Sequence, residues 1–127
     1  MLELRHRGWW LLMSAVLVGC VVWGSLETGT DIPAPPGFDK VEHLAVYLGL
    51  ALWFTGLARR GRYWAVVCGL LALGASMEAL QYAMHAGRTA DIRDMAANTG
   101  GIAVGILFAV LGTGGWARRV EAWLIRN

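Results

Sequence analysis

Four long apolar runs constrain the fold of this chain more than any other feature. They cover residues 9–26, 41–57, 63–84 and 95–111, and each reaches the length of about 17 residues that a helix needs to cross a bilayer. The composition agrees, because 57% of the 127 residues are apolar and the mean hydropathy is +0.50, which is unusual for a soluble domain. We therefore expect an all-α, polytopic membrane protein with four transmembrane helices in one domain, residues 1–127.

Arginines predict the orientation of these helices. They occur before the first run, between the second and third runs, and after the fourth run: Arg5, Arg7, Arg59, Arg60, Arg62, Arg118, Arg119 and Arg126. Four spans place these three segments on the same side of the membrane, and the positive-inside rule makes that side cytoplasmic. The sequence thus predicts an N-in/C-in topology.

Several features at the cytoplasmic side and within the spans have structural interpretations. Most of the tryptophans lie near the cytoplasmic ends, as in an interfacial aromatic belt: Trp9, Trp10, Trp53, Trp64 and Trp116. Gly101 and Gly105 form a small-residue pattern that favours close helix packing. The segment 116–125 has apolar residues on one helical face and arginines elsewhere, which predicts a short helix on the cytoplasmic membrane surface.

Polar residues gather at the opposite, outer ends of three runs. Asp39, His43 and Tyr47 recur at i, i+4 and i+8, so they share one helical face. The third and fourth runs carry similar stripes, made by Glu78, Gln81, Tyr82 and His85 and by Asp91, Asp94 and Asn98. Ionisable groups at such depth are costly and mark candidate functional sites. We expect an outer-facing polar cavity with walls from all three helices.

The chemistry of these residues suggests roles. His43 and Glu78 are the candidate acid and base, because histidine titrates near neutrality and burial raises the pKa of a carboxyl group. Arg88, with Lys40, is expected to pair with a phosphate or carboxylate. The remaining candidate ligand-binding residues, which would orient these groups, are Asp39, Gln81, Asp91, Asp94 and Asn98.

The order of these motifs resembles the VanZ-like family of small bacterial membrane proteins. The resemblance rests on Asp39-Lys40-x-x-His43, on Glu78-x-x-Gln81, and on a last motif that runs from Gly87-Arg88 through Asp91, Asp94 and Asn98 to Gly101. It implies a compact four-helix domain in the bacterial cytoplasmic (inner) membrane and a role in the cell envelope, since the family takes its name from a member linked to resistance to the glycopeptide teicoplanin. It implies no particular reaction.

Two functions remain open at this level. In the first, the polar site binds or processes an anionic, lipid-linked or glycopeptide-related envelope intermediate from the outer leaflet. In the second, the polar groups form a structural network between helices of a non-enzymatic scaffold or assembly protein. The sequence leaves open whether the protein is an enzyme, and it also leaves the oligomeric state open.

Other classes are less well supported. A metal site could draw on His43, Glu78, His85, Asp91 and Asp94, but no H-E-x-x-H or paired cysteine spacing is present, so we expect neither a metal nor another cofactor. Nucleic acid is not an expected partner, because topology already explains the basic residues. The expected partners are membrane lipids and the lipid-linked precursor.

Overall fold

Five α-helices make up the fold. The computed structural model describes residues 2–26, 35, 37–84 and 92–126. The helices are α1 (Arg7–Leu26), α2 (Phe38–Leu57), α3 (Tyr63–Ala83), α4 (Ile92–Phe108) and α5 (Trp116–Arg126), with a short 3-10 turn, η1 (Arg60–Arg62), before α3 and a π-helical turn, η2 (Ala109–Thr113), after α4. Within these residues no strand is present, and the all-α class predicted from the sequence is confirmed.

Three helical stretches are long and apolar enough to cross a membrane. They are Arg7–Leu26, Arg60–Ala83 and Ile92–Thr113, which match the first, third and fourth predicted spans. The second predicted span, residues 41–57, lies in α2, which is not one of the three stretches in the described part of the chain. Asp39, Lys40 and Glu42 stand in the first turns of this 20-residue helix, and these charges lower its overall apolarity.

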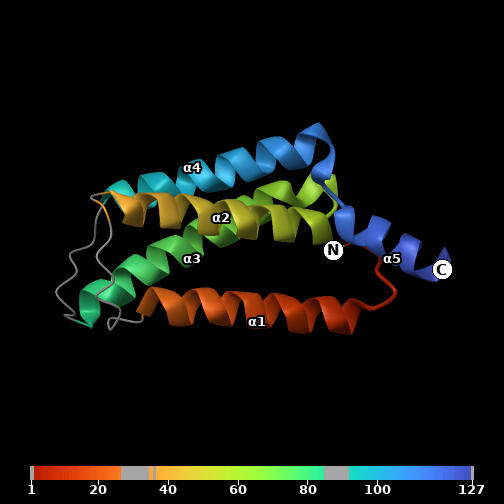
Figure 1. Cartoon of the computed structure of the whole chain (residues 1–127), viewed down its shortest axis with the longest axis horizontal. Helices are drawn as coiled ribbons and strands as arrows, with labels where there is room; N and C mark the ends of the chain where they lie inside the picture. Colours follow the sequence, from red (N-terminus) through yellow and green to blue (C-terminus); the bar gives the residue numbers. More distant parts are fainter. Residues whose placement is uncertain (1, 27–34, 36, 85–91, 127) are drawn as a thin grey trace.

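Close packing of α4 against α2 forms the centre of the bundle (Figure 1). A Cβ atom on Gly101 would lie 2.3 Å from the carbonyl oxygen of Leu44, and one on Gly105 would lie 2.5 Å from Cβ of Ala51. Only glycine allows the two backbones to approach this closely. The prediction that this glycine pair packs helices is confirmed.

The main apolar core lies between α2, α3 and α4. It consists of Tyr47, Leu50, Ala51, Leu70 and Ile102. Helix α1 lies at the edge of this bundle and packs against it through Leu17 and Val21. Ser14 is the only residue of α1 that is buried within the protein, which suits a helix that faces lipid on most sides.

The basic segments meet at one end of the bundle. The backbone N–H of Leu2 donates to the carbonyl of Leu57, and Arg59 pairs with Glu3 at 2.7 Å. Arg60 donates to the carbonyl of Val110, in the turn η2 that follows α4. The N-terminal segment, the α2–α3 connection and the α4–α5 connection therefore lie side by side, at the end where both termini appear in Figure 1.

Three tryptophans at this end pack on one another instead of forming a lipid-facing belt. The ring centroids of Trp10, Trp53 and Trp116 are 5.3 to 6.0 Å apart. Each indole N–H donates inward: Trp10 to Glu121, Trp53 to Ser14, and Trp116 to the carbonyl of Leu52. The predicted belt position applies only to the exposed Trp9 and Trp64, because the other rings find hydrogen-bond acceptors within the protein.

Helix α5 leaves the bundle after a sharp turn. Gly112 and Gly115 adopt positive φ angles of 143° and 69°, and the N–H of Gly115 donates to the carbonyl of Thr55. The predicted C-terminal helix is present and amphipathic: Ala117 and Glu121 are buried, whereas Val120, Leu124 and Ile125 are exposed. This pattern is typical of a helix at a membrane surface.

Candidate functional site

A polar cluster lies at the end of the bundle opposite the arginines, between α2 and α4. His43 on α2 and Asn98 on α4 are joined through Nδ1 and Oδ1, 2.9 Å apart. Asn98 Oδ1 is an acceptor, so this pair requires the proton on Nδ1 and leaves the Nε2 lone pair available. Nε2 faces Asp94, whose Oδ2 is 3.9 Å away.

Lys40 lies at the outer edge of this cluster. Its ammonium group is 2.7 Å from Oδ1 of Asp94 and 2.6 Å from Oδ2 of Asp39. The hydrogen bond from Lys40 holds the pKa of Asp39 below its usual range, so Asp39 stays ionised at neutral pH. Lys40 thus connects the first turn of α2 to the first turn of α4.

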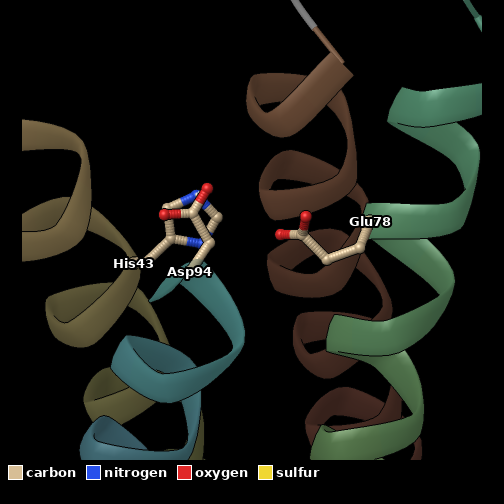
Figure 2. Close-up of side chains that lie close together, drawn as sticks. All are labelled: His43, Glu78 and Asp94. Carbon is tan, nitrogen blue, oxygen red and sulfur yellow. Dashed lines mark ion pairs between the residues drawn. The ribbon is translucent and has the colours of Figure 1, made fainter. Parts of the chain in front are cut away.

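Glu78 reaches the cluster from α3. Figure 2 shows its carboxylate directed toward His43 and Asp94, and the ligand atoms of the three residues all lie within 4.8 Å of one another. Glu78 is 8% exposed and lies five residues before Ala83, the last residue of α3. Three helices therefore place one imidazole and two carboxylates around a common point.

Gly74 keeps α3 close enough for this arrangement. A Cβ atom there would lie 3.1 Å from Asn98 Nδ2 and 3.2 Å from the hydroxyl oxygen of Tyr47. Tyr47 itself is buried directly below His43 on α2. The sequence analysis did not identify Gly74, since a glycine in an apolar run looks like any other small residue of a membrane helix. Its position one turn before Glu78 is the feature that could have indicated a role.

The cluster has a buried floor and a partly open mouth. Asn98 is 2% exposed, whereas the side chains of Asp94, His43 and Lys40 are 16%, 22% and 30% exposed. The ionisable groups of Asp94, His43 and Lys40 are thus reachable from the surface, whereas Asn98 and Glu78 are buried. We call His43, Glu78, Asp94, Asn98 and Lys40 the outer polar cluster.

The structure places the other predicted site residues differently. Asp39 lies at the edge and is joined to the cluster through Lys40. Gln81 turns toward α1, where its Nε2 donates to the carbonyl of Ser25 at 2.8 Å, so it holds α3 to α1. Arg88, Asp91 and His85 lie outside the described residues.

The comparisons with known proteins give one finding. A protein-family model described as VanZ/LLP1 matches residues 5–113, which include all the helices up to η2 and the whole of the outer polar cluster. No curated protein and no solved structure gives a significant match to the chain.

Proposed function

The chain belongs to the VanZ/LLP1 family, and on this premise we propose that it binds or processes an anionic, lipid-linked or glycopeptide-related intermediate of the bacterial cell envelope at the outer polar cluster. One observation carries this proposal most directly. The cluster combines buried orienting groups with reachable ionisable groups, an arrangement expected of a binding or catalytic site.

The proposal includes a four-span, N-in/C-in arrangement in the cytoplasmic membrane. Helix α2 lacks a strongly apolar first turn, but its backbone contacts that of α4 at both Gly101 and Gly105. A helix held this closely to a membrane-spanning neighbour crosses with it, and its charged first turn then lies at the outer interface. The outer polar cluster thus faces the leaflet in which lipid-linked envelope intermediates are used.

In this function an anionic headgroup first contacts Lys40, because Lys40 is the most exposed member of the outer polar cluster. Arg88 is the second expected cation. His43 is placed to accept or donate a proton through Nε2, since its Nδ1 is held by Asn98. Glu78 is the second candidate acid or base.

Binding can be tested in nanodiscs of neutral phosphatidylcholine titrated with a polyprenyl phosphate. We expect Lys40→Ala to weaken binding about tenfold or more, because it removes a charge-assisted contact. Arg118→Ala is the matched control, since Arg118 is an exposed cation at the other end of the molecule, and it should bind normally. Equal affinity of wild-type protein and Lys40→Ala would contradict the proposed headgroup contact.

Processing can be tested in cells that depend on this protein for an envelope phenotype such as glycopeptide susceptibility. His43→Ala and Glu78→Gln should abolish the phenotype at unchanged membrane abundance. Full activity of both variants would rule out a chemical role for these residues.

A scaffold function is the second candidate, favoured by the bond between Gln81 and the carbonyl of Ser25 and by the buried Asn98. If the polar groups act only as links between helices, function should fall in parallel with stability. Glu78→Gln and Gln81→Leu should then lower the unfolding temperature in detergent as much as they lower activity. An inactive variant with normal stability would argue against a scaffold.

A further inference from the structure

We propose that His43, Glu78 and Asp94 bind one divalent transition-metal ion, of the Zn²⁺ or Mn²⁺ class, at the outer polar cluster. The ligand atoms are one imidazole nitrogen and one carboxylate oxygen from each acidic residue, and they come from α2, α3 and α4 (Figure 2). The separate sequence positions explain why no metal-binding motif is visible in the sequence.

The distances fit a single ion after a small adjustment. Zn²⁺ binds nitrogen and oxygen ligands at about 2.0 to 2.2 Å, so two ligands of one ion lie at most about 4.3 Å apart. Nε2 of His43 and Oδ2 of Asp94 are 3.9 Å apart, and all three ligand atoms are within 4.8 Å of one another. A rotation of the Glu78 carboxylate about its side-chain bonds covers the remaining difference.

Neighbouring residues orient two of the three ligands. Asn98 accepts from Nδ1 of His43, which leaves Nε2 as the metal-binding nitrogen. Lys40 holds Oδ1 of Asp94, which leaves Oδ2 on the side of Nε2. These contacts place the lone pairs toward the ion before it binds, and such supporting contacts are a regular part of metal sites.

The charges favour a cation at this point. Glu78 and Asp94 bring two carboxylates within 4.8 Å of each other at a largely buried position. Lys40 offsets part of this charge through Oδ1 of Asp94, and two carboxylates so close also favour a cation on the side of Oδ2. A divalent ion between them removes the repulsion. The mixed nitrogen and oxygen donors suit Zn²⁺ or Mn²⁺ better than Mg²⁺ or Ca²⁺, which prefer oxygen alone.

The inference deepens the proposed function, on which its last step rests. Three protein ligands leave a coordination position open, as in catalytic zinc sites, and the exposed side of His43 and Lys40 gives access to it. A phosphate oxygen of an anionic headgroup would take that position, with Lys40 beside it. This assignment replaces the proton-transfer roles of His43 and Glu78 in the proposed function, because both residues then hold the ion.

The test uses the full-length protein in neutral nanodiscs, stripped with a chelator and titrated with Zn²⁺, Mn²⁺ and Mg²⁺ by calorimetry. We expect saturable binding of one Zn²⁺ or Mn²⁺ per chain and at least tenfold weaker binding of Mg²⁺. His43→Asn, Glu78→Gln and Asp94→Asn should each weaken binding at least 100-fold, and Asn98→Ala by 10- to 100-fold. Glu42→Gln, which removes an exposed carboxylate from the start of the same helix, should bind as the wild type does.

Cobalt provides a second measurement that needs no variant. Co²⁺ added to the stripped wild-type protein should give visible absorption bands of a site with nitrogen and oxygen ligands, and Zn²⁺ should displace them. The absence of these bands, the absence of saturable binding, or equal binding by wild type and Glu78→Gln would each overturn the proposal. Titration of polyprenyl phosphate with and without metal separates the two ideas: loss of lipid binding with intact metal binding contradicts only the proposed function.

Discussion

At the scale of single residues, Glu121 shows how one side chain joins distant parts of the chain. Its carboxylate, on α5, accepts from the backbone N–H groups of Arg5 and His6 and from the indole of Trp10, at 2.8 to 2.9 Å. These N–H groups stand just before and within the start of α1, which begins at Arg7. A side chain from another helix thus caps α1 and complements the positive end of its dipole.

The pKa of Glu121 follows from two opposed causes. Burial raises it, but the hydrogen bonds from His6, Trp10 and Arg5 together lower it below its usual value. A carboxyl whose pKa is lower in the folded state stabilises the fold above its unfolded pKa, and this contribution is lost as the pH falls through the folded value. The contact between α5 and α1 is therefore expected to weaken in acid.

Glu121→Ala should lower the unfolding free energy by about 2 kcal/mol at pH 7, because the charge-assisted hydrogen bonds from Arg5, His6 and Trp10 are lost. The deficit relative to wild type should shrink as the pH falls through the lowered pKa of the folded-state carboxyl, where the wild-type side chain also becomes protonated. Thermal unfolding in detergent, followed by the fluorescence of Trp10 and its neighbours, measures both effects. Glu3→Gln is the control, since its pair with Arg59 is exposed; a deficit for Glu121→Ala that does not depend on pH would contradict the capping role.

At the scale of elements, the contact between α2 and α4 determines the geometry of the outer polar cluster. Asp94 and Asn98 reach Lys40 and His43 only because the glycines below them let the backbones touch. Gly100 precedes Gly101 but faces elsewhere, where an added Cβ would be 3.9 Å from a side-chain methyl of Leu44. Adjacent glycines in one helix therefore differ in their roles.

Gly101→Ala should destabilise the protein by about 1 to 3 kcal/mol, because the new methyl group meets backbone atoms that cannot move aside without separating the helices. Gly100→Ala should be neutral or slightly stabilising, since it meets only ordinary contacts and raises helix propensity. Unfolding temperatures of the two variants in the same detergent provide the comparison. Equal stability of the two variants would show that α4 does not pack on α2 through Gly101.

At the scale of the whole molecule, polarity separates the two ends. Most of the arginines and the tryptophan cluster occupy one end, and the outer polar cluster, with Arg93 nearby, occupies the other. This division agrees with the N-in/C-in arrangement that we propose, because basic segments are retained in the cytoplasm.

Topology can be tested by cysteine labelling in intact cells, after Cys20 and Cys68 are replaced by alanine. Glu42→Cys should react with a membrane-impermeant maleimide from outside, whereas Gly61→Cys, in the turn before α3, should react only after the cells are permeabilised. Labelling of both positions on the same side would show that α2 does not cross the membrane.

The sequence by itself determined the class of the protein, the approximate limits of its helices and the candidate residues for its polar site. Hydropathy and helical spacing depend on the order of residues along the chain, so both patterns can be recognised before the neighbouring helix is known. Helical spacing shows which residues share a face, such as Asp39 and His43, but it does not determine the neighbouring helix or the rotation of that helix.

Only the tertiary structure decided which polar side chains meet. It directs Gln81 to Ser25, and it joins His43 to Asn98 with Asp94 and Glu78 beside them. It also turns Trp10, Trp53 and Trp116 inward and makes Glu121 a cap for α1. The physical reason is that close backbone contact at Gly101 and Gly105, a property of two helices together, sets the distances at which these side chains interact.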